Sequence, residues 1–363
     1  MKVATGLAIG REASSSLAAQ AVSQAMQAAG MTHASSVLLF LTSEFARDPV
    51  PALRAAARAA NCTQVMGCSA PGIFTEQDWI IDAPAAGAMV FNGEVSLQAA
   101  TKHDPDQLLL SLAAPNAINT LWMSTPGQRF GGVSGDAIGR GPFSVWQNGK
   151  GSAFGHCEAA LMGVEGAVSA THGLRILTEP QLVSQVAAHD LQMLAGKPAL
   201  QTLQKAYKYN NGNVDEPMPL HRLMAVYADE AAAFERGDYK LAMLVSGNEL
   251  DDSVTLAKRL ETDQLLCWAL REAESAQANL LQTAINLTEK LQTAPDFGLL
   301  FSCLGRGPYF YGGVDKDLDL LRQEFPQMPL IGFYGNGEIA PINGVSELLQ
   351  YSAVLGLFAE KTK

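Results

Sequence analysis

Two stretches of the chain share one order of elements and indicate the fold class. The first is "SSVLLFLTSEFARDPVPALRAAARAANCTQVMGCSAPGIF" (Ser35–Phe74), and the second is "DFGLLFSCLGRGPYFYGGVDKDLDLLRQEFPQMPLIGFYGNGEI" (Asp296–Ile339). Each begins with an apolar run of strand length, passes through a polar loop into a short helix, and returns to a second apolar run that ends at a glycine turn. The sequence therefore predicts an α/β protein of two related mixed α/β halves, each a sheet covered by helices, packed with approximate two-fold pseudo-symmetry.

The helices expected in these stretches carry apolar side chains at helical spacing, so each could cover one face of a sheet. A longer helix is expected upstream of both stretches, in "SSLAAQAVSQAMQAAG" and in "REAESAQANLLQTAINLTEKLQ", and a further strand downstream of both, from Gly87 and from Ser352. The predicted buried positions are Leu53, Ala56 and Ala60 in the first short helix, Leu318, Leu321 and Phe325 in the second, and Leu280, Ala284, Leu287 and Leu291 in the second long helix.

The length of 363 residues predicts two domains, because a domain usually has about 150 residues. The best boundary is the polar stretch "YKYNNGNVDEPMP" (Tyr207–Pro219), which has an Asn-Gly pair, charges and two prolines but little to bury. We therefore expect an N-terminal domain over residues 1–197, a linker or hinge over 198–219, and a C-terminal domain over 220–363.

Charge and composition exclude several classes of function. The net charge of −11 would repel phosphate backbones and anionic lipid, so nucleic acid is not an expected partner. No apolar stretch approaches the roughly 20 residues that span a bilayer, and the first residues lack a signal-peptide pattern. The five cysteines are scattered without C-x-x-C spacing, as is typical of free thiols in a reducing compartment. We expect a cytoplasmic protein without membrane insertion.

The turn in "GFYGNGEIAP" carries the first candidate site. Asn336 and Gly337 predict a hairpin turn, because both tolerate the positive φ that a type I′ turn needs. Glu338 is then either a solvated residue leaving the turn, or the one charge beside glycines that let the backbone approach a ligand. The counterpart turn, "GCSAPGIF", offers Cys68, Ser69 and Gly72 instead of a carboxylate.

A second candidate lies in "LLFSCLGRGPYFYGG", where an apolar strand leads into Cys303 and then Arg306 between two glycines. An arginine at the carboxyl end of a buried strand is in a usual place for ligands, and its guanidinium can bind a carboxylate with two parallel hydrogen bonds. The alternative is an internal salt bridge, with Glu338 as one candidate partner. Cys303 is more typical of an inert buried thiol than of a nucleophile.

The third candidate segment, "FGGVSGDA", contributes Gly132 and Ser134. It resembles a phosphate loop only loosely, because neither phosphate-binding glycine spacing is present, so no nucleotide cofactor is expected. A hairpin is predicted further on, with Asn148-Gly149 at its turn. His156 and Cys157 are neighbours on an expected strand and would point to opposite faces, so no metal site is predicted.

The motifs "GCSAPGI", "FGGVSGDA", "FSCLGRG" and "GFYGNGEIAP" resemble, in this order, those of FIST proteins, named for F-box and intracellular signal transduction. The likeness has an N-terminal part up to about Lys197 and a C-terminal part from about Leu220. One departure is Ile73 and Phe74, where the family commonly has a glutamate after the first turn. The resemblance implies a sensory or ligand-binding module, found alone in bacteria, beside signalling domains, or with an F-box in eukaryotes. It brings no established catalytic residues.

The leading hypothesis is a non-catalytic sensor that binds a small polar ligand, such as an amino acid, in a cleft between the halves. Arg306 would pair a ligand carboxylate and Glu338 an ammonium group, and a separate signalling protein would receive the output. The predicted ligand-binding residues are Cys68, Ser69, Gly72, Gly132, Ser134, Cys303, Arg306, Asn336, Gly337 and Glu338.

Two other classes remain open. One is an enzyme with Cys68 or Cys303 as nucleophile beside amides of a glycine turn, with His156 or His172 as the base. The other is a scaffold without a small ligand, which would show a large exposed apolar patch.

Overall fold

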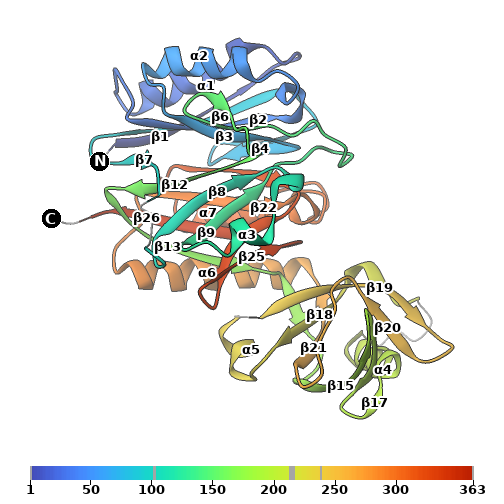
Figure 1. Ribbon diagram of the computed structural model, residues 1–363. Helices are drawn as coiled ribbons and strands as arrows, with labels where there is room; N and C mark the ends of the chain where they lie inside the picture. Colours follow the sequence, from blue (N-terminus) through green and yellow to red (C-terminus); the bar gives the residue numbers. More distant parts are fainter. Residues whose placement is uncertain (1, 101–103, 212–216, 238, 362–363) are drawn as a thin grey trace. The chain divides into compact units, whose positions relative to one another are not determined.

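The structure is a computed structural model that describes residues 2–100, 104–211, 217–237 and 239–361 (Figure 1). It divides into two compact units. The larger comprises Met1–His172 together with Leu280–Lys363, and the smaller is Gly173–Asn279. The smaller unit is therefore an insertion into the sequence of the larger one.

The larger unit contains three six-stranded sheets, which we name A, B and C. Sheet A has the strand order β1-β6-β2-β3-β10-β11, in which β2 and β3 are parallel and every other neighbouring pair is antiparallel. Its strands are β1 (Lys2–Ile9), β6 (Ala85–Asn92), β2 (Ser36–Thr42), β3 (Val65–Ala70), β10 (Val145–Gln147) and β11 (Lys150–Gly151).

Sheets B and C repeat this order. In sheet B, β22 and β23 are the parallel pair, and in sheet C the pair is β8 and β9. The strands of sheet B, in spatial order, are β13 (Val164–Thr171), β26 (Ala353–Glu360), β22 (Phe297–Cys303), β23 (Leu330–Gly335), β4 (Gly72–Thr75) and β5 (Trp79–Ile81). Those of sheet C are β7 (Ser96–Gln98), β12 (His156–Met162), β8 (Leu108–Ala113), β9 (Gln128–Val133), β24 (Glu338–Ile342) and β25 (Val345–Leu349).

The three sheets exchange strands in a closed cycle. After the second parallel strand of each sheet, the chain crosses to another sheet and adds a two-stranded hairpin there. From sheet A, β3 leads to β4 in sheet B; from sheet B, β23 leads to β24 in sheet C; and from sheet C, β9 leads to β10 in sheet A. Each crossing turn therefore starts at the carboxyl end of a parallel pair, which is the usual position of ligands in open α/β sheets.

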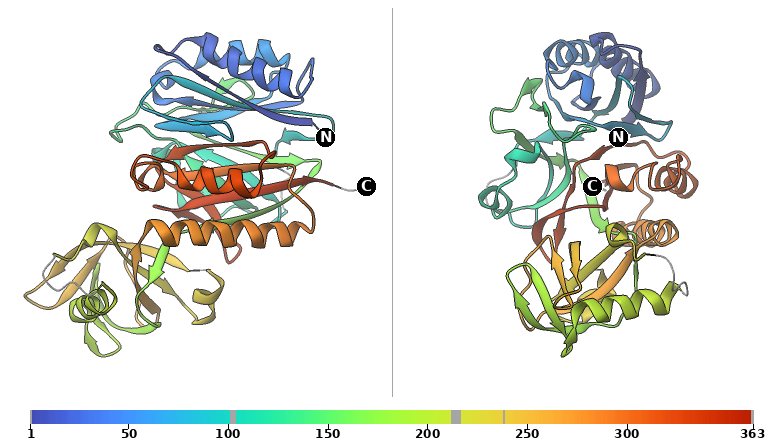
Figure 2. Two further views of the ribbon diagram at one scale, coloured as in Figure 1. Left: turned by 180° about the vertical axis from the view of Figure 1, so that it is seen from behind. Right: turned by 90° about the vertical axis from the view of Figure 1, so that its right-hand side faces the viewer.

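Helices cover the outer faces of sheets A and B (Figures 1 and 2). The predicted apolar stripes are confirmed, because their leucines and alanines pack on the outer faces of these sheets. Sheet C has only short helical segments beside it. The helices associated with the larger unit are α1 (Ser15–Ala28) and α2 (Val50–Ala60) on sheet A, α6 (Ala273–Leu291) and α7 (Lys316–Glu324) on sheet B, and α3 (Thr120–Met123), with the 3₁₀ turns η1 (Ser43–Phe45), η2 (Pro115–Ala117) and η4 (Leu304–Arg306) in loops.

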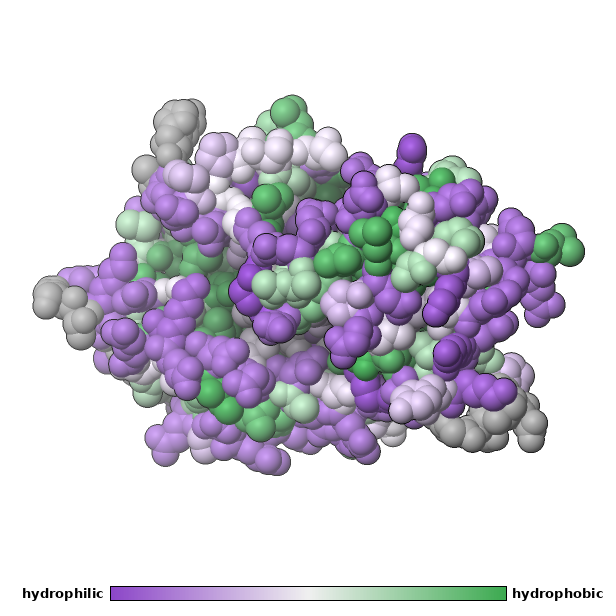
Figure 3. All heavy atoms as spheres, turned by 90° about the horizontal axis from the view of Figure 1, so that it is seen from below, coloured by the Kyte–Doolittle hydropathy of each residue, from purple (hydrophilic) through white to green (hydrophobic). Residues whose placement is uncertain are grey.

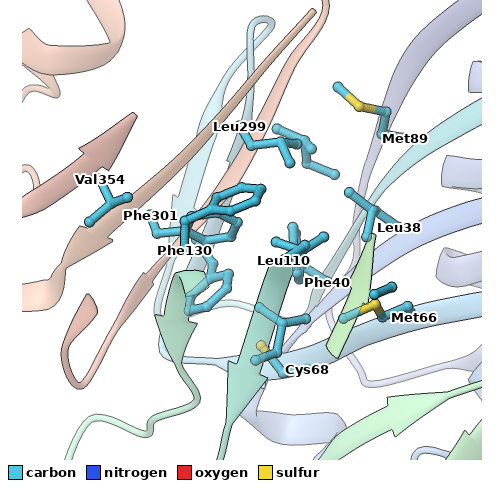
Figure 4. Packing of buried hydrophobic residues seen from close by; sticks show 14 of the residues in the cluster. Leu38, Phe40, Met66, Cys68, Met89, Leu110, Phe130, Leu299, Phe301 and Val354 are labelled. Atoms are coloured by element: carbon cyan, nitrogen blue, oxygen red, sulfur yellow. The ribbon is translucent and has the colours of Figure 1, made fainter. Parts of the chain in front are cut away.

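The inner faces of the three sheets meet in one hydrophobic core (Figure 4). Phe40 of sheet A contacts both Phe301 and Phe333 of sheet B, with ring centroids 6.3 and 5.0 Å apart. Phe130 of sheet C reaches the same group, with its centroid 6.4 Å from that of Phe301. Burial of such side chains contributes about 1.5–3 kcal/mol each, so this shared core fixes the three sheets together.

One glycine in each second parallel strand allows that strand to lie close to its partner. A Cβ atom at Gly67, Gly131 or Gly332 would lie 1.7, 2.0 or 1.7 Å from the carbonyl oxygen of the residue opposite in the first parallel strand. Any side chain would therefore force the two strands apart. These three glycines are equivalent positions of the repeat.

The smaller unit is one antiparallel sheet that closes on itself, because β21 pairs with both β15 and β18. Its interior is filled by apolar side chains, and Trp268 inside it donates to Thr202 of α4 over 2.9 Å. Its elements are β14 (Leu174–Ile176), β15 (Gln181–Ala187), β16 (Asp190–Leu194), β17 (Lys197–Pro198), α4 (Ala199–Asn211), η3 (Leu220–Arg222), β18 (Leu223–Ala228), α5 (Ala232–Arg236), β19 (Lys240–Asn248), β20 (Ser253–Leu256) and β21 (Leu265–Arg271).

The predicted mixed α/β architecture with related halves is confirmed. The two-fold relation is not established, and sheet C adds a third copy of the strand order. Along the sequence, the boundaries between the compact units lie at 172/173 and 279/280. The domain boundaries predicted from the sequence are 197/198 and 219/220. Helix α4 occupies the first part of the expected linker, and residues 212–216 lie outside the described residues. None of the described helices is long and apolar enough to span a membrane.

Candidate functional site

The crossing turns that follow β3, β9 and β23 meet one another. The amide of Asn336 donates to the carbonyl of Val133 over 2.9 Å, and the amide of Val133 donates to the carbonyl of Gly337 over 2.9 Å. The hydroxyl of Ser134 donates to the carbonyl of Ser69 over 2.6 Å. The structure thus brings together Ser69, Ser134, Asn336 and Gly337 from all three predicted segments.

The turn at Asn336 and Gly337 is not the hairpin that the Asn-Gly pair predicts. Strand β23 before it belongs to sheet B, and β24 after it belongs to sheet C, paired with β9 and β25. Gly337 still has a positive φ of 146°, so a glycine is needed for the crossing. The pair Asn148-Gly149 does form its predicted hairpin, with φ of 53° and 66° between β10 and β11.

Glu338 is the first residue after this crossing, and its side chain is completely buried. The interpretation of Glu338 as a solvated turn residue is therefore wrong. Its Oε2 accepts from the amide of Ser352 over 3.3 Å, whereas its Oε1 has no hydrogen-bond partner in the part of the chain that the structure describes. Burial raises the pKa of Glu338 well above its usual value, against smaller opposing effects of Ser352 and the Arg306 charge.

Arg306 is also buried, at the carboxyl end of β22, and forms an internal ion pair. Its Nε lies 2.8 Å from Oδ2 of Asp317, and its Nη1 donates to the carbonyl of Thr171 over 2.8 Å. The alternative of an internal salt bridge is therefore correct, although Asp317 takes the place proposed for Glu338. Arg306 still acts on Glu338 electrostatically, because its charge favours the ionised carboxylate.

Further polar side chains extend this group beneath the helices of sheet B. Tyr311 donates to Oδ1 of Asp317 over 2.6 Å, and Tyr334 donates to Asp315. Asp315 also caps α7 by accepting from the amide of Leu318 over 2.9 Å. Burial, and then the charge of Asp317, raise the pKa of Asp315 to about 6.

His172 also belongs to this group of buried polar side chains. It is the last residue of the larger unit before the chain enters the smaller one. Its Nδ1 lies 2.8 Å from Oγ of Ser352, the residue whose amide binds Glu338. Burial, and then the charge of Arg306, lower the pKa of His172 to about 3, so the imidazole is neutral at physiological pH. We name the polar cluster by its members, which are Thr171, His172, Arg306, Tyr311, Asp315, Asp317, Tyr334, Glu338 and Ser352.

Most partners in the polar cluster were missed from the sequence. The Asp315-x-Asp317 pattern ahead of a helix predicts a capped start, but gives no reason to place Asp317 beside Arg306. His172 was considered only as a base for a thiol nucleophile, and nothing local marks Ser352. These residues meet through strand pairing between β13, β26 and β22, which are far apart in the sequence.

Other predicted site residues have structural roles. Cys68 is fully buried in the shared core, and burial raises its pKa well above the usual value. Gly132 packs against Phe333, where a Cβ would lie 2.7 Å from the ring, and Gly72 packs against Ile81, with a corresponding distance of 2.5 Å. These contacts give Cys68, Gly72 and Gly132 a clear packing function.

Cys303 ends β22 and is 8% exposed. Ile73 and Phe74, which replace the glutamate common after the first turn, are buried: Ile73 in the shared core, and Phe74 under the helices of sheet B. The two crossing turns therefore differ, with apolar side chains after one and a carboxylate after the other.

The distribution of hydrophobic side chains on the surface is relevant to the scaffold hypothesis, which expects a large exposed apolar patch. On the face shown in Figure 3, hydrophobic side chains occur in small groups among hydrophilic ones. One hollow in the larger unit has a volume of about 550 Å³. Its lining includes Asp106, Phe130, Glu165 and Lys361, and neither Arg306 nor Glu338 is part of it. The polar cluster is therefore distinct from this hollow.

Comparison with known proteins bears on the C-terminal part of the chain. Residues 199–341 match the family model of the FIST C domain. This part of the chain is therefore similar to the FIST C domain. The match starts in the smaller unit and continues into the larger one, so the FIST C sequence does not correspond to one compact unit. It includes Arg306, Asn336, Gly337 and Glu338, but ends before Ser352.

Several known proteins are also similar to this chain in sequence. An uncharacterized protein of Mycobacterium tuberculosis (strain ATCC 25618 / H37Rv) is 24% identical over 384 residues, which cover 99% of this chain and 100% of the relative. An uncharacterized protein of Mycobacterium bovis is 25% identical over 232 residues, which cover 63% of this chain and 60% of the relative. F-box only protein 22 of Homo sapiens is 33% identical over 95 residues, which cover 26% of this chain and 21% of the relative. The resemblance to FIST proteins is thus confirmed.

Proposed function

We propose that this protein is a non-catalytic sensor in signal transduction that binds a small polar ligand at the carboxyl ends of β22 and β23. The observation that carries the proposal is Oε1 of Glu338, which is buried and has no hydrogen-bond partner in the described residues. A buried polar atom without a partner destabilises the folded state by about 1–3 kcal/mol. A carboxylate oxygen kept at this cost is explained if a ligand binds to it. The FIST C domain supports a sensory role.

The chemistry of the polar cluster favours a ligand that carries a protonated amine. Burial raises the pKa of Glu338 well above its usual value, which favours the neutral acid when no cation lies beside it. An ammonium group at Oε1 would stabilise the carboxylate, so binding would release a proton from Glu338. An amino acid is the candidate class. Arg306 would contribute its charge from within the Asp317 pair rather than as a bidentate clamp on the ligand carboxylate.

The site requires the three crossing turns to be rigid, and the hydrogen bonds between them support this. The turn that precedes Glu338 is held by Val133, and the end of β3 is held by Ser134 through the carbonyl of Ser69. Preorganised groups of this kind reduce the entropy lost when a ligand binds. Because the turns come from all three sheets, the ligand would bind where the repeats converge. The output would pass to a separate signalling protein, which we expect in the cytoplasm.

Isothermal titration calorimetry with a panel of amino acids tests the proposal on wild type, Glu338→Gln and Glu165→Gln. Glu165 lies on an exposed position of β13 and is the matched control. A hydrogen bond to a charged group contributes about 1.5–3 kcal/mol, so Glu338→Gln should weaken binding roughly tenfold to a hundredfold. Glu165→Gln should bind as wild type does. Buffers of different ionisation enthalpy should also reveal the released proton.

Equal affinity of wild type and Glu338→Gln would refute the assignment of this site. Lack of binding by every member of the panel would refute amino acids as the ligand class.

A further inference from the structure

We infer that the Glu338 site controls the conformation of the chain segment through which the smaller unit is joined to the larger one. The inference deepens the proposed function, on which it depends for the nature of the natural trigger. It starts from the position of His172. Strand β13 ends at Thr171, and β14, the first strand of the smaller unit, begins at Leu174. Only His172 and Gly173 lie between them.

Two connections lead from Glu338 to this segment, one through hydrogen bonds and one through the charge of Arg306. Along the first, Glu338 accepts from the amide of Ser352, and Oγ of Ser352 lies 2.8 Å from Nδ1 of His172. Along the second, the charge of Arg306 acts on Glu338 while Nη1 of Arg306 donates to the carbonyl of Thr171 over 2.8 Å. The last two residues of the larger unit before the insertion are therefore both tied to groups that respond to the charge of Glu338.

The segment beyond His172 is itself fixed. Gly173 has a φ of 64°, and its carbonyl accepts from the amide of Glu272 over 3.3 Å. Glu272 precedes α6, accepts from Ser275 over 2.9 Å and pairs with Arg175 at 3.1 Å. Helix α6 then returns the chain to the larger unit. The outgoing and returning segments are thus bonded to each other within the smaller unit, directly after the residue that the polar cluster holds.

The physical basis of the coupling is a change of charge at a buried position. A carboxylate at Glu338 attracts the Arg306 guanidinium and strengthens the bond from the Ser352 amide, whereas a neutral acid does neither as strongly. Arg306 and Ser352 are the groups that contact Thr171 and His172. Ionisation of Glu338, by a cationic ligand or by high pH, should therefore alter the hydrogen bonding of residues 171–173.

Other charged and titratable groups face this site from neighbouring elements. They are His172 at the end of β13, Arg306 in η4, Tyr311 in the loop before α7, Asp315 and Asp317 at the start of α7, and Tyr334 on β23. His172, with a pKa of about 3, titrates below the neutral range, and Asp315, with a pKa of about 6, titrates within it. A variant that changes only Glu338 separates the effect of its ionisation from the titration of His172 and Asp315.

Hydrogen–deuterium exchange tests the coupling without a ligand, because pH serves as the trigger. Exchange of residues 171–176, corrected for intrinsic rates, is followed from about pH 5 to about pH 10 in wild type, Glu338→Gln and Ser352→Ala. Wild type should show a change in protection of about threefold or more as Glu338 ionises. Glu338→Gln should lack it. Ser352→Ala keeps the amide that binds Glu338 but loses the hydroxyl next to His172, so its response should be reduced.

Thermal unfolding verifies that each variant is folded, and peptides from α1 serve as the internal reference. An identical pH response in wild type and Glu338→Gln would overturn the coupling, whatever the amino-acid titrations show. A response that depends on Glu338, together with no amino-acid binding, would support the coupling and refute the proposed ligand class. The two failures are therefore distinguishable.

Discussion

Arg306 and Asp317 form an ion pair in which both side chains are almost completely removed from solvent. The distance from Nε to Oδ2 is 2.8 Å, and the side chains are 1% and 2% exposed. Breaking a buried pair by removing one partner typically costs about 3–5 kcal/mol, because the other charge is left uncompensated. The pair therefore ties η4 to the start of α7 and holds the carbonyl of Thr171.

Replacing Arg306 by alanine should thus lower the free energy of unfolding by about 3–5 kcal/mol, as measured by urea denaturation. The control is Asp319→Asn, which removes the partner of Arg322 in a pair whose members are 29% and 54% exposed. That change should cost less than about 1 kcal/mol. Equal effects of the two substitutions would contradict a buried ion pair at Arg306.

Replacing Gly332 by alanine should destabilise the protein strongly. The new Cβ would lie 1.7 Å from the carbonyl oxygen of Leu300, so β22 and β23 would have to separate. Overpacking of a core costs about 1–3 kcal/mol or more, which should appear as a lower midpoint in thermal unfolding. Gly151→Ala is the control, since no atom lies within 4 Å of its added Cβ. A midpoint for Gly332→Ala equal to that of the control would disprove the close approach.

The pH dependence of stability should reveal Asp315. Its pKa rises from 3.8 to about 6 on folding, so the folded state binds more protons than the unfolded state between these values. The free energy of unfolding therefore decreases as pH rises through this window, by about 3 kcal/mol from this group. Asp315→Asn retains a capping side chain for α7 and should remove that decrease. Urea denaturation at several pH values measures it, and an unchanged profile would contradict the assignment.

The thiols should differ in accessibility. Cys62 is partly exposed, whereas Cys68 and Cys157 are buried, and burial raises the pKa of all three. Iodoacetamide at neutral pH should therefore label Cys62 slowly, and label Cys68 and Cys157 only after unfolding. Peptide mass spectrometry gives the extent at each position. Rapid, selective labelling of Cys68 in the native protein would instead support the cysteine-dependent enzyme.

The local sequence was sufficient for most elements of the larger unit. Apolar runs, helical stripes and glycine turns predicted the parallel strands of sheets A and B, the helices that cover them, and β6 and β26, because these patterns reflect the period of each structure and the burial of one face. The similarity of Ser35–Phe74 to Asp296–Ile339 was found for the same reason. Sheet C escaped this comparison, since its repeat has only short helical segments where α1, α2, α6 and α7 stand in the other two.

The candidate site was predicted only in part. The sequence marked Arg306 and Glu338, because an arginine between glycines and a lone carboxylate after a glycine turn are both unusual near apolar strands. It could not show that Asp317 binds Arg306, or that Ser352 and His172 lie beside Glu338. Those contacts depend on pairing between strands that are far apart in the chain.

The sequence by itself determined the parallel strands and covering helices of sheets A and B, which faces these helices bury, and several positions that need glycine. The tertiary structure alone decided where each strand goes after its crossing turn, so that the pair Asn336-Gly337 joins two sheets instead of closing a hairpin. The physical reason is that side-chain periodicity specifies a face of a strand but not its neighbour. Backbone hydrogen bonds can be satisfied by many partners, and the choice among them is made by packing of the shared core.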